Sequence, residues 1–265
     1  MQKFNYHTHT YRCGHADKFM SDEDYVKLFI KKGFKEIAFT DHCPQKNKID
    51  FRKSMRMDYS QKDEYIASIN KLKEKYKDKI NIKVGFEIEY DETQEENILE
   101  LKKQTDILVL GQHFIVSNNE LKTFFKKDYF SSDDLINYAN TIEKVLDKNL
   151  VDIIVHPDSY MYVRDSFGEV EREVAHIICK SAEKHNVPLE INLTEVNRNL
   201  IGILDKISYP CKEFWNIASL YNVKVLYGID AHFKNQIENY EKCIELANEI
   251  IGKDVISKLN FIDKL

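Results

Sequence analysis

Short apolar runs alternate along the chain with longer segments in which apolar residues recur at helical spacing. The runs have the length of buried strands and cover residues 4–7, 36–40, 80–88, 107–110, 152–155, 187–191 and 223–227. The segments between them are predicted helices over residues 22–32, 61–77, 93–103, 133–148, 169–185, 210–221 and 235–251. Regular alternation of this kind predicts an α/β fold with a parallel sheet and right-handed crossovers, either open or closed into a barrel.

The same organisation continues from one end of the sequence to the other. Ser21, Ser60 and Ser132 stand where the N-caps of three helices are expected, and Gly33 follows the first of these helices. No linker or repeat interrupts the pattern, so we expect a single domain over residues 1–265. Two long stretches lack a clear pattern, residues 44–59 and 115–129.

The composition is that of a globular protein. The 15 tyrosines and 15 phenylalanines exclude a disordered chain, and a net charge of -5 argues against nucleic-acid binding through bulk charge. No stretch approaches about 18 uninterrupted apolar residues, and the N-terminus resembles no leader, so we expect no membrane association and a cytoplasmic protein. The five cysteines form no CxxC pair and suggest no disulfide framework.

Histidines gather at the C-terminal ends of the predicted strands. Seven of the nine lie at or just beyond these ends: His7, His9, His15, His42, His113, His156 and His232. Carboxylates follow the same strands, namely Asp41, Glu87, Glu89 and Asp230. In a parallel sheet or barrel, this edge is where ligands bind. The other two histidines, His176 and His185, fall on a predicted helix, and we expect them to be structural.

The spacing of these residues favours metal ligation. His7 and His9, like Asp230 and His232, are two residues apart at a strand end, which directs both side chains to one side. A single histidine at a strand end is more often a structural residue. Structural roles do not explain seven histidines at the same edge. Imidazoles mixed with carboxylates select zinc, iron or manganese, and ligands at an open edge without thiolates are typical of a catalytic site. The number of ligands suggests two or three ions.

The motifs at these positions resemble those of the polymerase and histidinol phosphatase (PHP) family along nearly the whole chain. They are His7-Thr8-His9-Thr10, Cys13-Gly14-His15-Ala16, Thr40-Asp41-His42, Gly85-Phe86-Glu87, Gln112-His113, His156-Pro157 and Asp230-Ala231-His232. Within the family they look most like the monofunctional histidinol-phosphatases of histidine biosynthesis. The resemblance implies a distorted (β/α)7 barrel that holds three divalent ions, zinc, iron or manganese, without an organic cofactor.

The resemblance also implies a ligand set. His7, His9, Glu87 and Asp230 would hold the first ion, and Glu87 would bridge to a second ion bound by His113 and His156. The third ion would take His15, His42 and His232. Asp41 matches a position adjacent to the site, and Glu89 is a weaker candidate for ligation.

Arginines near strand ends are candidates for phosphate recognition, because the planar guanidinium matches phosphate oxygens. Arg164 and Arg198 resemble the phosphate-contacting arginines of the histidinol-phosphatase branch, and Arg12 is a weaker third candidate. The alternative for any of them is a surface salt bridge.

The implied reaction is hydrolysis of L-histidinol phosphate, a small phosphate ester, by a hydroxide that bridges two ions. Asp41, Glu87 and Asp230 are the predicted catalytic residues. Asp41 or a metal-bound water would protonate the leaving group, and the sequence does not choose between them. Cys13 and Cys43 lie close to the predicted ligands, but we interpret them as packed thiols.

Three alternatives stay open. The chain could hydrolyse nucleotides, short oligonucleotides or phosphotyrosine on the same scaffold, although no basic stripe with interleaved aromatics supports nucleic acid. It could be a metal-dependent amide hydrolase, or a binding module descended from the fold. Residues 44–59, which include Arg52, Arg56 and Asp58, could form a lid or a covering loop, and Asp158, Glu195, Tyr160, Tyr162 and Phe114 are candidates for reading the substrate.

Overall fold

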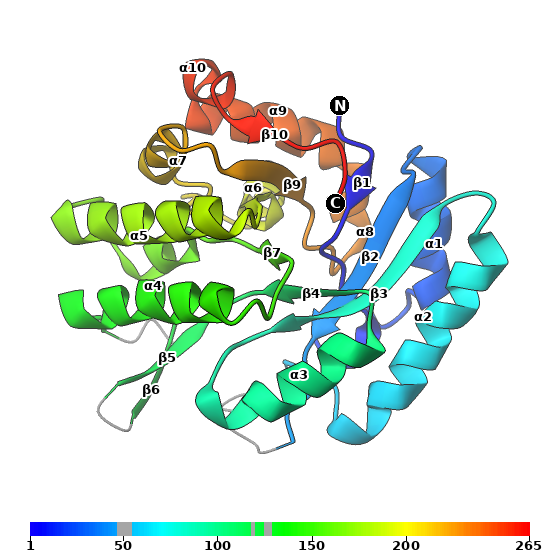
Figure 1. The fold of residues 1–265 in the computed structure, drawn as a ribbon. Coiled ribbons are helices and arrows are strands. Elements are labelled where there is room, and N and C mark those ends of the chain that lie inside the picture. Colours follow the sequence, from blue (N-terminus) through cyan, green and yellow to red (C-terminus); the bar gives the residue numbers. More distant parts are fainter. Residues whose placement is uncertain (47–54, 118–119, 125–128) are drawn as a thin grey trace. The chain divides into compact units, whose positions relative to one another are not determined.

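A computed structural model describes residues 1–46, 55–117, 120–124 and 129–265 (Figure 1). The chain forms two compact units, which we describe separately. Unit 1 comprises residues 1–109, 228–240 and 264, and unit 2 comprises residues 110–227, 241–263 and 265. The predicted single domain over residues 1–265 stays a prediction. None of the helices in the described ranges is long and apolar enough to cross a membrane.

The sheet of unit 1 is formed by the first four strands in chain order. They are β1 (Phe4–Asn5), β2 (Glu36–His42), β3 (Asn81–Ile88) and β4 (Ile107–Leu110). β2 pairs in parallel with β1 and β3, and the register places His42 opposite Glu87. Most of these strand residues are buried, as expected for apolar runs inside a parallel sheet.

Helices accompany the strands of unit 1, as the alternation predicted. They are α1 (Asp22–Lys31), α2 (Lys62–Tyr76), α3 (Glu95–Gln104) and α8 (Lys234–Glu238). A capping box between Ser21 and Asp24 starts α1, and its buried face includes Tyr25, Val26 and Phe29. The predicted cap Ser21 is therefore confirmed.

Gly85 allows the strands of unit 1 to approach closely. A side-chain carbon at this position would lie 2.1 Å from the carbonyl oxygen of Ile107. Only glycine fits there without moving β4, so the glycine sets the path of β3 two residues before Glu87.

The segment after β1 lies between two other chain segments of unit 1. Thr40 N donates to Thr8 O at 2.9 Å, and on the other side His9 N donates to Ala231 O at 2.9 Å. Thr8 and Ala231 form a parallel bridge. These backbone bonds align residues 7–9, 40–42 and 230–232, the three segments that contain most of the predicted ligands.

In unit 2 the sheet continues from Leu110, the last residue of β4. Val155 N, just after β7 (Ile153–Ile154), donates to Leu110 O at 3.0 Å. The strand order then runs through β8 (Leu189–Asn192), β9 (Lys224–Gly228) and β10 (Asn260–Phe261), with parallel pairing of β7 with β8 and of β9 with β10. A separate antiparallel hairpin joins β5 (Phe114–Ser117) and β6 (Glu120–Thr123).

Six α-helices belong to unit 2, among the residues that the structure describes. They are α4 (Ser132–Asp147), α5 (Glu169–His185), α6 (Thr194–Leu200), α7 (Lys212–Ala218), α9 (Tyr240–Ile251) and α10 (Lys253–Ile256). The long helices α4 and α5 lie side by side (Figure 1). Ser131, not Ser132, is the N-cap of α4, because its side chain accepts from Asp134 N.

The α/β class and the parallel sheet are confirmed, and each of the seven predicted strands is present. The sheet also contains β10, which was not predicted. All of the hairpin of β5 and β6 except Phe114 lies within residues 115–129, where no element was expected, and three of the four residues of β6 are polar. The predicted helix over residues 235–251 is two helices, α8 and α9.

Candidate metal centre

His7 and His9 face two carboxylates in unit 1. His7 Nε2 lies 3.5 Å from Asp230 Oδ1 and 3.6 Å from Glu87 Oε2. His9 Nε2 lies 3.1 Å and 3.5 Å from the same two oxygens. His7, His9 and Asp230 each offer a ligand atom within 4.8 Å of the others. The two imidazoles therefore converge, as their spacing predicts.

Glu87 connects this group to a second group of histidines. Its Oε2 lies 2.8 Å from His42 Nδ1, and His9, His42 and Glu87 offer ligand atoms within 4.8 Å of one another. The same holds for His15, His42 and His232. We call these seven residues the metal corner: His7, His9, His15, His42, Glu87, Asp230 and His232.

Two rings of the metal corner are oriented by backbone carbonyls. His15 Nδ1 lies 3.1 Å from Cys13 O, and His232 Nδ1 lies 3.0 Å from Asp230 O. A carbonyl only accepts, so Nδ1 has the hydrogen and Nε2 has the lone pair that a metal needs. His232 Nε2 is buried and has no hydrogen-bond partner among the described residues. This donor set fits a divalent ion.

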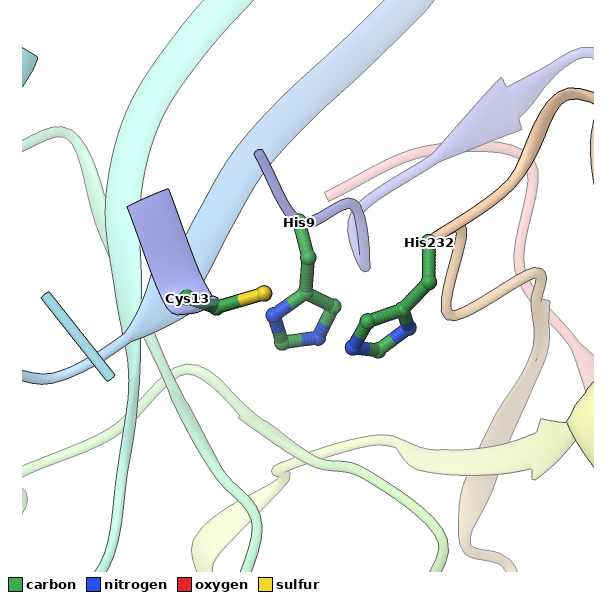
Figure 2. A group of neighbouring side chains, drawn as sticks. All are labelled: His9, Cys13 and His232. Atoms are coloured by element: carbon green, nitrogen blue, oxygen red, sulfur yellow. The ribbon is translucent and has the colours of Figure 1, made fainter. Parts of the chain in front are cut away.

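Cys13 lies beside the rings of His9 and His232 (Figure 2). The two rings stack with centroids 4.0 Å apart, and the thiol points toward His9. Burial raises the pKa of the Cys13 thiol well above its usual range, so that the thiol stays protonated at neutral pH. Cys13, His9 and His232 also offer ligand atoms within 4.8 Å of one another, so the interpretation of Cys13 as a packed thiol stays a prediction.

Charges in the metal corner act against the effect of burial at His9 and Asp230 and add to it at His15. Burial alone would lower the pKa of His9, but the nearby carboxylates of Asp230, Asp41 and Glu87 raise it to about 9. The pKa of His15 is lowered to about 4 by burial and by His232 and His9. Burial would raise the pKa of Asp230, but His7 and His232 hold it well below its usual range. The site therefore favours a positive group between its carboxylates.

The backbone of two predicted ligands is in the left-handed region. Asp230 in unit 1 has φ of 50°, and His156 in unit 2 has φ of 34°. Residues other than glycine rarely adopt these angles, which cost about 1–3 kcal/mol and concentrate at functional sites. The strain at Asp230 is consistent with a fixed direction for its side chain.

In unit 2 the structure brings His113 and His156 together. Both are buried, and their ring centroids lie 4.8 Å apart. The ring of Tyr209 lies 6.3 Å from that of His156. Bridging of Glu87 to an ion held by His113 and His156 stays a prediction.

Asp41 is buried next to the first histidines of unit 1. Its Oδ1 accepts from His42 N at 2.9 Å and lies 3.6 Å from His9 Nδ1. Its Oδ2 accepts from the backbone N of Thr10 at 3.1 Å and from the Thr10 hydroxyl. Thr10 was not singled out in the sequence, although it belongs to the first motif.

The three candidate arginines differ in how they are engaged. Arg12 is buried and donates to Asp22 and Glu64, so both ends of its guanidinium are engaged in ion pairs. Arg164 donates through Nε to Glu171 at 2.6 Å and through Nη1 to Phe130 O at 3.1 Å. Arg198, in α6, is exposed, and its side chain has no polar partner among the described residues.

Glu89 forms an ion pair with Arg56. Its Oε2 accepts from Arg56 Nη2 at 2.5 Å, and both side chains are buried. Glu89 is therefore engaged in an ion pair and belongs to none of the candidate ligand groups among the described residues. Residues 47–54, including Arg52, lie outside the described residues, so the choice between lid and covering loop stays open.

Asp158 and Glu195, two acidic candidates for substrate recognition, accept hydrogen bonds from N–H groups of unit 2. Asp158 Oδ2 accepts from Cys211 N at 2.7 Å and from Trp215 Nε1 at 3.0 Å. Glu195 Oε2 accepts from Ser208 N at 2.5 Å and Tyr209 N at 3.2 Å. These contacts give one oxygen of each carboxylate a structural role. Asp158 Oδ1 is buried without a hydrogen-bond partner among the described residues, and burial raises the pKa of Asp158 to about 7.

The helical histidines are engaged as expected for structural residues. His176 Nδ1 lies 2.8 Å from Tyr221 Oη, and His185 Nε2 lies 2.8 Å from Asp147 Oδ1. His185 is also at the C-terminal end of α5, where a positive charge suits the helix dipole.

Comparisons with known proteins agree with the motifs. The PHP domain family matches residues 5–194. Histidinol-phosphatase from Bacillus subtilis is 29% identical over 88% of this chain and 94% of its own length. A Listeria monocytogenes protein assigned as a histidinol phosphatase has a similar fold, with a TM-score of 0.73 and 22% identity over 91% of this chain and 99% of that one.

A second solved structure has the same fold. Histidinol phosphate phosphatase from Lactococcus lactis, in complex with zinc, L-histidinol and phosphate, has a TM-score of 0.66 and 20% identity. The match covers 93% of this chain and 94% of that chain.

Proposed function

The chain belongs to the PHP family, and from this premise we propose that it hydrolyses L-histidinol phosphate to L-histidinol and phosphate. The broader assignment, a metal-dependent phosphatase, follows from the family and from relatives with this activity in their names. Support for the substrate comes from Bacillus subtilis histidinol-phosphatase and from the Lactococcus lactis complex with L-histidinol and phosphate.

The observation on which the proposal depends most is the metal corner. Five imidazoles and two carboxylates from residues 7–15, 42, 87 and 230–232 converge in unit 1, with ligand atoms within 4.8 Å in each group. We propose that His7, His9, Glu87 and Asp230 hold one ion, and His15, His42 and His232 another. His113, His156 and Glu87 complete the proposed set of three ions.

Divalent ions bound to these residues would lower the pKa of water and neutralise phosphate oxygens. The chain's own residues then have separate tasks. Glu87 Oε2, 2.8 Å from His42 and 3.5 Å from His9, is in position to serve two ligand groups at once. Asp230 and the backbone carbonyls of Asp230 and Cys13 fix the directions of the imidazoles.

Phosphate recognition is assigned first to Arg198. Its guanidinium is exposed and has no partner among the described residues, so it can donate to phosphate oxygens without breaking an existing contact. Arg164 would have to share its guanidinium with Glu171 and Phe130 O. We therefore expect Arg164 to contribute less than Arg198.

The proposal is tested by phosphate release from purified protein whose metal content is measured on the same sample. L-Histidinol phosphate is compared with AMP, phosphotyrosine and p-nitrophenyl phosphate, with chelator-treated protein and metal re-addition as controls. We expect kcat/KM for L-histidinol phosphate to exceed the others by at least about 100-fold, because a specific site reads the leaving group as well as the phosphate.

The other outcomes separate the parts of the proposal. A preference for a nucleotide would overturn the substrate and leave the metal-dependent phosphatase assignment intact. Full activity after complete metal removal would overturn the role of the metal corner. Bound metal without turnover on any ester would favour the amide hydrolase or the binding module.

A further inference from the structure

A buried arginine lies in the loop between His9 and His15. Arg12 Nη1 donates to both oxygens of Asp22 in α1, at 2.8 Å and 3.0 Å. Its Nε and Nη2 donate to the two oxygens of Glu64 in α2, at 2.9 Å and 3.0 Å. A guanidinium held at both ends of its planar fork has a fixed orientation. Arg12 therefore anchors this loop to two helices of unit 1.

The anchored guanidinium also contacts Thr10. Arg12 Nη1 lies 3.3 Å from Thr10 Oγ1, and the backbone N of Arg12 donates to the same oxygen at 3.3 Å. Arginine offers only donors, so the lone pairs of the Thr10 hydroxyl accept these bonds. The single hydrogen of the hydroxyl is then directed to Asp41 Oδ2, which Thr10 N also contacts.

Asp41 transmits this orientation to His9. With Oδ2 held by Thr10 and Oδ1 held by His42 N, the carboxylate has one direction, and Oδ1 lies 3.6 Å from His9 Nδ1. A carboxylate at Nδ1 favours the hydrogen on that nitrogen and leaves the lone pair on Nε2. His9 Nε2 is the nitrogen that faces Asp230 and Glu87.

We propose that Arg12 is a positioning residue for the metal corner and that, through Thr10 and Asp41, it fixes the tautomer and direction of His9. Asp41 then orients a ligand and is not the acid that protonates the leaving group, because both its oxygens already accept buried hydrogen bonds. The inference rests on the proposed metal centre.

The test is a titration of metal-free protein with Co²⁺, followed by visible absorption and by competition with a coloured chelator. Thr10→Val removes the hydroxyl at nearly constant volume, and Thr10→Ser restores it. Arg12→Lys keeps the charge but loses the planar fork. Lys122→Met is the matched control, because it breaks a half-buried contact to Asp134 in unit 2, at 2.6 Å.

We expect Thr10→Val and Arg12→Lys to weaken Co²⁺ binding by about 10–100-fold and to change the absorption spectrum, as loss of an outer-shell partner does. Thr10→Ser should stay within about threefold of the wild type, since the hydroxyl is present. Lys122→Met should lower Tm without changing Co²⁺ binding.

The outcomes distinguish this inference from the proposed function. If the wild type binds Co²⁺ and Thr10→Val binds it with the same affinity, the positioning role is overturned and the metal centre stays intact. Equal losses in Thr10→Val and Thr10→Ser overturn it too, because the hydroxyl would then not matter. A wild-type protein that takes up no Co²⁺ overturns the metal centre and this inference together.

Discussion

Buried acidic groups occur in both units, but their partners differ. In the metal corner of unit 1, Glu87 and Asp230 face imidazole nitrogens at 2.8–3.6 Å. In unit 2, Asp158 and Glu195, which we call the acidic corner, accept from backbone and indole N–H groups at 2.5–3.2 Å. Both sets lie at or just beyond strand ends.

The partners indicate what each corner is for. In the acidic corner, N–H groups of the backbone and of Trp215 donate to one oxygen of each carboxylate, and these donors cannot be exchanged for an ion. Imidazoles instead offer lone pairs, so a carboxylate among them is suited to a cation. Position at a strand end therefore identifies an acidic residue as a candidate metal ligand. The groups that face its carboxylate then show whether it is a metal ligand or a structural residue.

The largest expected effect is that of Glu87→Gln. Replacing the carboxylate that faces His7, His9 and His42 should lower kcat/KM by at least about 1000-fold, or about 4 kcal/mol in the barrier. Tm of the metal-free protein should change little, since glutamine has nearly the same volume. Steady-state kinetics and thermal unfolding on the same samples check both parts.

A Glu87→Gln variant with near-wild-type turnover would contradict the role of this carboxylate in the metal corner. A large loss of Tm in the metal-free state would instead make Glu87 a structural residue like Asp158. The comparison between the two corners would then fail.

Asp158→Ala should have its main effect on stability. It leaves Cys211 N and Trp215 Nε1 buried without an acceptor, which should lower the free energy of unfolding by about 3 kcal/mol. Asp158→Asn keeps one acceptor oxygen and should lose about 1 kcal/mol or less. Denaturant unfolding measures both, and equal stability of Asp158→Ala and wild type would remove Asp158 from the structural class.

The sequence predicted the strands and the gathering of histidines well, because both depend on local pattern. Buried apolar runs determine the strands, and the chain places their C-terminal ends at one edge. The partners of charged side chains were less predictable. Arg12 looked like a phosphate contact and Glu89 like a metal ligand, but Glu64 and Arg56 pair with them from 52 and 33 residues away in the sequence.

Short elements were missed for a related reason. β10 has two residues and β6 has mostly polar ones, so neither produces an apolar run. Thr10 had no signal of its own, because a threonine next to two histidines has many ordinary uses. Its importance is visible only from its contacts to Asp41 and Arg12.

We expect Arg198→Ala and Arg164→Ala to have effects of intermediate size, the first on kcat/KM and the second on Tm. Loss of a charged hydrogen bond to phosphate costs about 2 kcal/mol, so Arg198→Ala should lower kcat/KM by about 30-fold with little change in Tm. Arg164→Ala should lower Tm instead, because Glu171 in α5 loses its ion pair and keeps only the bond from Gly168 N. Inhibition by inorganic phosphate should weaken in Arg198→Ala, and unchanged inhibition would place Arg198 on the surface without a role.

The smallest expected effect belongs to Asp134, a buried carboxylate of unit 2 with a cationic partner. Burial raises its pKa, but the contacts to Lys122, Ser117 and Ser131 lower it by more, so that the folded-state pKa lies well below the usual value of 3.8. A depressed carboxylate pKa stabilises the fold above the unfolded-state pKa, and this contribution is lost as pH falls through the folded-state pKa.

Asp134→Asn should therefore cost about 1 kcal/mol of unfolding free energy at pH 7, since it weakens the N-cap of α4 and the contact to Lys122. The difference from wild type should shrink as pH falls below about 4, because the wild-type carboxyl also becomes protonated in the unfolded state. Urea unfolding at a series of pH values measures this difference. A loss that is the same at every pH would show that the amide change alone accounts for it, and that the charge of Asp134 contributes nothing to the buried pair.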